Sequence, residues 1–324
     1  MRSPKSYWLL PILILSCVFS LTASIPDVST GTWQTWNAMG DVRSGAAAVL
    51  LQDGRVFIIG GTNANGPVAS ADLFGTDGNF SAAAAMQTPR SGHTATVLSD
   101  GRVLVTGGVT SSGGAVNTAE IYDPSANSWS APTTTVDARA GHTASLLSDG
   151  RVLLAGGHDS AGNALSSLEI FDPASGKFSS AGAMGVPRMN HAAATLGDGR
   201  VLIIGGTADG TNALASIDIY DPSAGTASSG PVLSTPRMSA TATTTLDGKV
   251  AVIGGNNGSA SGSQDLASAE IFDSATGQLS PSASSLVTAR SGHQAFLLPK
   301  NNAILVLGGS SAGTDLNLAE IYYP

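Results

Sequence analysis

Short apolar runs separated by polar turns recur along the chain from about residue 32 to its end. In a representative unit, residues 141–147 are small or apolar except for His142, an Asp149-Gly150 step follows, and residues 152–155 form a second apolar run. Residues 168–171 then alternate in polarity, and Phe178 opens a fourth segment. Asp-Gly tolerates the positive φ angles of a tight hairpin turn. The pattern predicts four short antiparallel strands per unit, the second of them buried on both faces.

A Gly-Gly pair ends the second run in six successive units, and the pairs are 47, 49, 49, 49 and 54 residues apart. A repeat of about 50 residues built from short strands is typical of one propeller blade. We therefore predict an all-β, six-bladed β-propeller with four antiparallel strands per blade. The chain stops after a third strand at 319–322, so we expect an N-terminal strand at 32–39 to complete the last blade and remove an exposed edge.

The first 24 residues differ from the repeats. Arg2 and Lys5 precede an apolar run, and small residues follow at 22–24. This order predicts a secretory signal peptide at 1–24, followed by one propeller domain at 25–324 and export to the periplasm or the extracellular space. Two alternatives remain open: lipidation at Cys17, the single cysteine, and an uncleaved membrane anchor. Any contact with a membrane is expected only through this segment.

Without the leader, 13 basic residues face 23 acidic ones, and 11 of the basic residues fall into two repeated slots. Cations spread evenly around a ring form no patch for phosphates, so nucleic acid is not an expected partner. No thiol remains in the exported chain, so its stability is expected to come from burial and strand pairing. We expect a monomer.

Four elements of the repeat carry a resemblance to a known family. They are an Arg-x-Gly-His strand, a Gly-Gly end, a Tyr-Asp step and a later Trp, found here as Arg90-Ser91-Gly92-His93, Gly107-Gly108, Tyr122-Asp123 and Trp129. This pattern resembles Kelch repeats of the exported bacterial type, and the architecture is similar to the central domain of galactose oxidase. The resemblance implies the propeller fold but no single activity, because such propellers include binding scaffolds, sugar oxidases and mutarotases.

The copper-radical chemistry of the galactose oxidase group is not expected here. That cofactor requires a tyrosine joined to a cysteine, and the exported chain has no cysteine. Tyr122, Tyr220 and Tyr322 also occupy a structural slot of the repeat. We expect no cofactor, no metal and no catalytic residue.

Departures from the repeat point to a candidate binding site. Connections between strands two and three, and from strand four to the next blade, emerge on one face, where they vary in length and content. Residues that every blade repeats, including His93, His142, His191 and His293, are interpreted as architectural. The departures on the variable face are the candidate binding residues His158, Asp159, Asn190, Asn256, Asn257 and Asp265.

We expect a binding scaffold that presents this face to a protein or a cell-surface glycan. The loops consist mainly of small polar residues and contain no aromatic side chain on which a sugar could stack. One alternative is a carbohydrate-active enzyme of mutarotase or isomerase type, with His158, Asp159 or a channel histidine as acid and base. Another is a structural or adhesive module with no discrete ligand.

Overall fold

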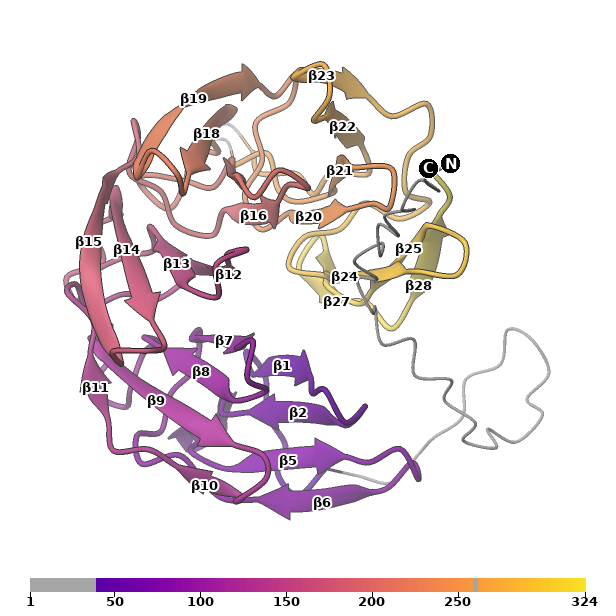
Figure 1. Cartoon of the computed structure of the whole chain (residues 1–324). Coiled ribbons are helices and arrows are strands. Elements are labelled where there is room, and N and C mark those ends of the chain that lie inside the picture. Colours follow the sequence, from indigo (N-terminus) through magenta and orange to yellow (C-terminus); the bar gives the residue numbers. More distant parts are fainter. Residues whose placement is uncertain (1–38, 259–261) are drawn as a thin grey trace, which may run out of the picture.

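The computed structural model describes residues 39–258 and 262–324. Every regular element in these residues is a β-strand, and six sheets follow one another in chain order around a central axis (Figure 1). The predicted all-β, six-bladed propeller is confirmed. No helix in the described residues is long and apolar enough to cross a membrane. The predicted signal segment 1–24 and nearly all of the predicted strand 32–39 lie outside the described residues.

Each blade is an antiparallel meander that begins at the axis and steps outward (Figure 1). Blade 1 contains β1 (Ala47–Leu50), β2 (Val56–Ile59), β5 (Ala71–Phe74) and β6 (Phe80–Ala83). Blade 2 contains β7 (Thr94–Val97), β8 (Val103–Thr106), β9 (Thr118–Asp123) and β10 (Ser128–Trp129), and β11 (Thr133–Thr134) also pairs with β9. Blade 3 contains β12 (Thr143–Leu146), β13 (Val152–Ala155), β14 (Ser167–Asp172) and β15 (Lys177–Ala183).

The remaining blades repeat this order. Blade 4 contains β16 (Ala192–Thr195), β17 (Val201–Ile204), β18 (Ser216–Asp221) and β19 (Thr226–Val232). Blade 5 contains β20 (Thr241–Thr244), β21 (Lys249–Ile253), β22 (Ala269–Asp273) and β23 (Gln278–Pro281). Blade 6 contains β24 (Gln294–Leu298), β25 (Ala303–Leu307) and β28 (Ala319–Tyr322). Two small ribbons lie between second and third strands: β3 (Thr62–Asn63) with β4 (Gly66–Pro67), and β26 (Ser310–Ser311) with β27 (Thr314–Asp315).

The second strand of each blade carries the hydrophobic core. In β8, Val103 and Val105 pack against blade 1, whereas Leu104 packs against blade 3, and all three are at most 1% exposed. Alternate side chains therefore serve opposite neighbours, which confirms that this strand is buried on both faces. Five clusters of this kind join blades 1 to 6 in consecutive pairs. Within the described residues, no such cluster joins blade 6 to blade 1.

A buried arginine ties the start of each blade to its second and third strands. Arg90 donates from Nη1 to the carbonyl of Gly107 (2.7 Å) and from Nη2 to Oε1 of Glu120 (2.9 Å), and both charged side chains are fully buried. Glu120 also accepts hydrogen bonds from the backbone amides of Gln87 and Thr88. Removing one partner of such a pair costs about 3–5 kcal/mol because the other charge is left buried and uncompensated. The equivalent pairs are Arg43–Asp72, Arg139–Glu169, Arg188–Asp218, Arg237–Glu270 and Arg290–Glu320.

Candidate functional site

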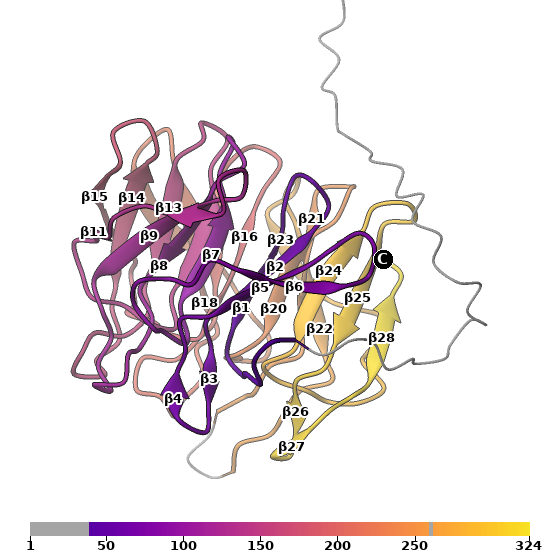
Figure 2. The ribbon, with the colours of Figure 1, turned by 90° about the horizontal axis from the view of Figure 1, so that it is seen from below.

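The propeller has two chemically different faces. Because consecutive strands run in opposite directions, turns from strand one to two and from strand three to four lie on one face, here called the hairpin face. Connections from strand two to three and from strand four to the next blade lie on the other, here called the loop face. Figure 2 shows the β3–β4 and β26–β27 ribbons projecting on the same side of the ring, which is the loop face.

His158 and Asp159 open the loop of blade 3. The backbone of His158 forms isolated bridges to Ala140 and Ala164, and the residue after Gly-Gly makes an equivalent bridge to the preceding segment in all six blades. Its half-buried ring has Nδ1 3.0 Å from the carbonyl oxygen of Asp159. The Asp159 carboxylate accepts hydrogen bonds from the side chain of Asn163 and from the amides of Asn163 and Ala161. Asn163 is the main cause of the lowered pKa of Asp159, which is therefore ionised.

Asn190 departs from the repeat for a conformational reason. Its φ is 53°, in the left-handed region where four sibling blades have glycine, and Ser239 in blade 5 has the same φ. Asparagine tolerates this region better than most residues. The Asn190 amide donates to the carbonyl of Gly141 (3.0 Å), and its own carbonyl accepts from the amide of Ser239 (2.8 Å). Asn190 is one member of a series of backbone hydrogen bonds that joins consecutive blades from Gly45 to Gly292.

Asn256, Asn257 and Asp265 join the described parts of the long loop of blade 5 on either side of residues 259–261. Asn256 donates from Nδ2 to Oδ1 of Asp265 (3.0 Å), and Oδ1 of Asn257 accepts from the amide of Gln264 (2.9 Å). Asp265 also reaches blade 6, where its Oδ2 accepts from the amide of Ala312 (2.8 Å). Burial opposes ionisation of Asp265, but hydrogen bonds from Ser291, Asn256 and Ala312 outweigh it and lower its pKa.

The structure spreads the six candidate residues over the loops of blades 3, 4 and 5. It brings Asn256 and Asp265 into contact, and His158 beside Asp159 by sequence, but it forms no shared pocket from the six. None of them lines the cavity on the propeller axis. The side chains of Asp159, Asn256, Asn257 and Asp265 bond within or beside their own loops. The binding role of the six residues stays a prediction.

The sequence pattern predicts an architectural role for the four repeated histidines, and three of them bond a threonine of the preceding blade. The Nε2 atom of His142 lies 2.9 Å from Oγ1 of Thr94 and 3.0 Å from Oγ1 of Thr106, both in blade 2. The equivalent bonds are His191 to Thr143 and His293 to Thr241, both 2.9 Å. Burial, followed by the charges of nearby arginines, lowers the pKa of His191 to about 3 and that of His293 to about 4.

The axis of the ring holds a cavity of about 570 Å³ lined by the first strands of all six blades. Two of its wall residues were missed by the sequence analysis: Gln294 and Phe296 of β24. The equivalent positions in the other blades carry Ala, Thr, Ser or Val. Comparing the units slot by slot along the first strand would have found both residues.

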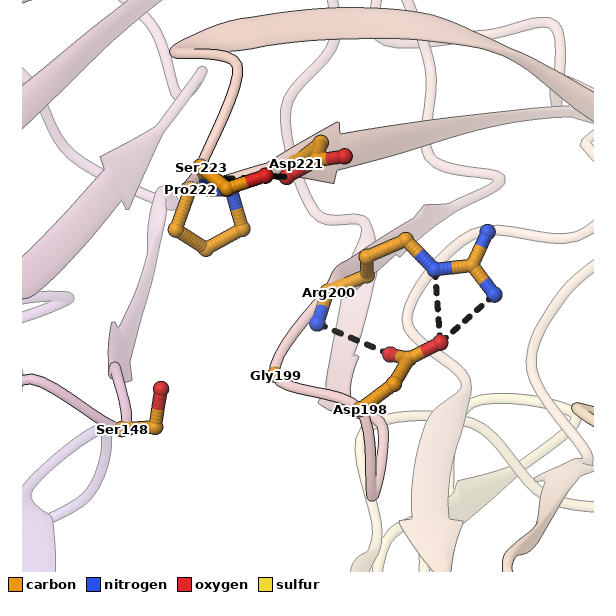
Figure 3. Close-up of a pocket in the computed structure, with 7 residues that line it drawn as sticks. All are labelled: Ser148, Asp198, Gly199, Arg200, Asp221, Pro222 and Ser223. Carbon is orange, nitrogen blue, oxygen red and sulfur yellow. Dashed lines mark hydrogen bonds and ion pairs between the residues drawn. The ribbon is translucent and has the colours of Figure 1, made fainter.

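Three smaller grooves lie on the hairpin face, with volumes of about 340, 280 and 210 Å³. Each lies between the hairpins of two consecutive blades, and Figure 3 shows the one at blades 3 and 4. There Asp198 binds Arg200 through Nε (2.8 Å) and Nη2 (2.7 Å), and Asp221 accepts from the hydroxyl of Ser223 (2.6 Å). Their polar groups pair with one another and recur from blade to blade, so these grooves belong to the architecture.

In the ranges 39–258 and 262–324, no group of three or more His, Cys, Asp or Glu side chains could hold a metal ion.

Comparison with known proteins supports the fold and identifies the family. The solved structure of YjhT matches with a TM-score of 0.71 and 18% identity, covering 88% of this chain and 95% of that one. A fungal alcohol oxidase of the AA5 family in complex with copper matches with a TM-score of 0.68 and 21% identity. That match covers 86% of this chain but only 62% of the oxidase, and at such identities both structures share the fold alone. No curated protein matches this chain in sequence. The sequence profile of the KLHDC2/KLHL20/DRC7 Kelch-repeats domain matches residues 19–206, more than half of the chain, and the chain therefore belongs to the Kelch-repeat family.

Proposed function

We propose that this chain is an exported binding scaffold whose loop face engages a protein partner with a basic surface. Kelch propellers commonly serve as scaffolds for protein interactions. The observation that carries the proposal for this chain is that its solvent-accessible Lys and Arg side chains lie on one face, which leaves the other face with carboxylates alone.

The loop face carries carboxylates without exposed cations. Six aspartates lie in its connections, and none is buried: Asp41, Asp137, Asp159, Asp209, Asp265 and Asp315. Hydrogen bonds within their loops, led by those from Asn163 and Asn212, lower the pKa of Asp159 and of Asp209. In the described part of the chain, the six arginines that begin the blades are the only Lys or Arg residues near this face. Their side chains are at most 1% exposed and paired with third-strand carboxylates.

The exposed basic residues of the described chain all lie on the hairpin face. Five follow the first turn of a blade and pair with the aspartate two positions earlier, as Arg102 does with Asp100 at 2.7 Å. Lys177 and Lys300 lie beside the other turns of that face. A face of one sign attracts an oppositely charged partner and accelerates its association.

The described loop residues of this face are held by hydrogen bonds within their own loops. Asp209, for example, accepts hydrogen bonds from the amides of Thr211 and Asn212 and from the Asn212 side chain. Loops held in this way lose little conformational freedom on binding, which favours affinity. They also differ from blade to blade, so they offer a surface on which one partner is distinguished from another.

A charge-matched pair of triple variants tests the proposal. Asp159→Asn, Asp209→Asn and Asp315→Asn remove three charges from the loop face. Asp123→Asn, Asp172→Asn and Asp221→Asn remove three charges from turns of the hairpin face, where those aspartates cap their turns in the same manner. A partner captured by the exported chain is purified, and its affinity is measured at low and high salt.

We expect the affinity to fall at least tenfold with salt and at least tenfold in the loop-face variant, with little change in the hairpin-face control. Equal losses in both variants, or binding that salt does not weaken, would contradict the proposed face. Export is tested by sequencing the amino terminus of the purified protein. It should begin near residue 25, or at Cys17 if lipidated, and a cytosolic chain that retains residue 1 would exclude export.

A further inference from the structure

The cavity on the propeller axis differs most from the repeat pattern where blade 6 meets blade 1. Gln294 and Phe296 share one face of β24, two positions apart, while Ala295 and Leu297 on the opposite face pack toward blade 5. In the other blades, the face of the first strand that corresponds to Gln294 contacts the next blade along the chain. Thr94 of blade 2, for example, bonds His142 of blade 3. Gln294 and Phe296 are therefore directed toward blade 1.

Blade 1 offers only small side chains to this part of the cavity. Ala46 stands where four blades have histidine, Ala47 stands where three have threonine, and Ala48 also lines the cavity. Because no hydrophobic cluster of the described residues joins these two blades, Phe296 remains 48% exposed. A large aromatic ring therefore faces open space above a wall of alanines.

One buried polar group on the cavity wall lacks the partner that its siblings have. His93 is 7% exposed and lines the cavity, and neither of its ring nitrogens has a hydrogen-bond partner of ordinary geometry. Its siblings bond the threonine of the preceding blade through Nε2, but Ala47 replaces that threonine in blade 1. The backbone groups of Ile59 and Arg90 raise the pKa of His93, against the larger effect of burial, but neither contact has ordinary hydrogen-bond geometry. A buried polar group in this situation favours a ligand that can complete its hydrogen bonding.

The cavity wall is polar but uncharged. Its lining contains Thr, Ser, Gln and His side chains but no Asp, Glu, Lys or Arg. Burial, followed by the nearby arginine charge, lowers the pKa of His93 to about 3, so this ring is neutral at physiological pH. The arginines that begin the blades form ion pairs with their carboxylate partners and do not line the cavity. An anionic or cationic ligand would lose hydration here without gaining an opposite charge.

We propose that this cavity binds an uncharged, hydroxyl-bearing ring, such as a neutral sugar, against Phe296 and Gln294. The apolar face of a pyranose ring packs on an aromatic side chain, while its hydroxyls donate to and accept from the Gln294 amide, Thr94 and the His93 ring. A volume of about 570 Å³ lies within the range of about 300–1,000 Å³ typical of small-molecule sites. The residues that line this site are distinct from the six aspartates of the loop face, and the site does not depend on a protein partner.

Matched small probes test the proposal by calorimetry or ligand-observed NMR. Methyl β-D-glucopyranoside and methyl β-D-galactopyranoside are the neutral probes, and glucuronic acid and glucosamine are their charged counterparts. We expect saturable binding of at least one neutral glycoside and at least tenfold weaker binding of both charged sugars. Equal binding of neutral and charged sugars, or no binding of any, would overturn the proposal.

Variants of β24 test whether the glycoside contacts Phe296 and Gln294. Phe296→Ala should weaken binding of the neutral glycoside at least tenfold, and Gln294→Thr, which introduces the side chain of three sibling blades, should weaken it several-fold. Phe296→Leu keeps the apolar bulk, so it should preserve the thermal midpoint while weakening binding by loss of the aromatic face. The loop-face triple variant should bind the glycoside as the unaltered chain does. If Phe296→Ala lowers the thermal midpoint but leaves glycoside binding unchanged, then Phe296 only packs against blade 1 and the proposed site is wrong.

Discussion

At the scale of single residues, an amino acid that differs from its counterparts in the other blades marks a position but does not give its role. Asn190 stands out because four sibling blades have glycine in its slot. The structure accounts for both facts by a φ of 53°, which glycine adopts without strain and asparagine adopts at modest cost. His158 differs from its siblings only in its side chain, because its backbone bridge recurs in every blade. The sequence can identify such departures, but the backbone angles behind them become visible only in the folded chain.

Substitutions at Asn190 separate a backbone role from a binding role. Asn190→Gly should change the free energy of unfolding by less than about 0.5 kcal/mol. Glycine adopts a positive φ without strain, but it loses more conformational entropy on folding, and the two effects oppose each other. Asn190→Ala should lower it by about 1 kcal/mol, since alanine is strained at positive φ. Urea denaturation measures both, with Gly92→Ala as a control at an equivalent position with a φ of 62°, where an added Cβ would meet no atom within 4 Å. If glycine destabilises as much as alanine, the Asn190 side chain itself carries the role.

At the scale of elements, regular segments could be predicted and local ones could not. The Asp-Gly turns and apolar second runs place β12–β13 and its equivalents correctly, because hairpin chemistry and periodicity act over several residues. The β3–β4 and β26–β27 ribbons have two-residue strands, which are too short to show a period. Phe296 was missed for another reason: alternation along β24 predicts a strand but does not tell which face meets an open cavity.

The edge of blade 6 supports the prediction that a strand at 32–39 completes it. Ile321 of β28 is 47% exposed. In blades 1 to 3 an aromatic side chain of the outer strand packs on an aromatic of the third strand, as Phe178 does on Phe171 with ring centroids 4.7 Å apart. Among the described residues, Tyr322 has no such partner. Trp33 precedes Arg43 by ten residues, the same separation as between Phe178 and Arg188. The spacing predicts that Trp33 occupies the outer aromatic slot of blade 6.

Removing the indole should therefore destabilise the ring. We expect Trp33→Ala to lower the free energy of unfolding by up to about 3 kcal/mol, because a buried Trp or Phe replaced by Ala typically costs 3–5 kcal/mol and an outer strand is only partly buried. Chemical denaturation of the exported form measures the change. Val42→Ala is the control, since Val42 is 87% exposed and its loss should change stability by less than about 0.5 kcal/mol. Unchanged stability in Trp33→Ala would mean that another segment covers β28.

At the scale of the whole molecule, the ring is held by contacts between blades that involve neutral histidines. Each histidine ring lies beside the first glycine of the preceding blade's Gly-Gly pair; a Cβ on Gly107, for example, would come within 2.8 Å of Cε1 of His142. Burial is the main cause that lowers the pKa of His93 and His191 to about 3 and that of His293 to about 4, and it places that of His142 well below its ordinary value. Each folded ring therefore stays neutral at a pH where the unfolded chain has already bound a proton.

This difference predicts a specific loss of stability in mild acid. An unfolded histidine has a pKa near 6.5, so the stabilisation is fully present above that pH and is lost as the pH falls through the folded values of about 3 to 4. Each histidine should contribute about 1.4 kcal/mol per pH unit below 6.5. Carboxylates of the unfolded chain remain mostly ionised down to about pH 5, so the slope between pH 6 and 5 belongs to the histidines.

A single substitution tests the origin of that slope. His191→Ala introduces the residue that blade 5 already carries at Ala240, so the fold should tolerate it with a lower stability at pH 7. Urea denaturation at several pH values should show the slope between pH 6 and 5 reduced by about a quarter, since one of four protonation sites is gone. An unchanged slope would place the acid sensitivity elsewhere, and the buried arginine–carboxylate pairs would then be the groups to vary. A reduced dependence of stability on pH would show that the histidines stabilise the contacts between blades only while they remain uncharged.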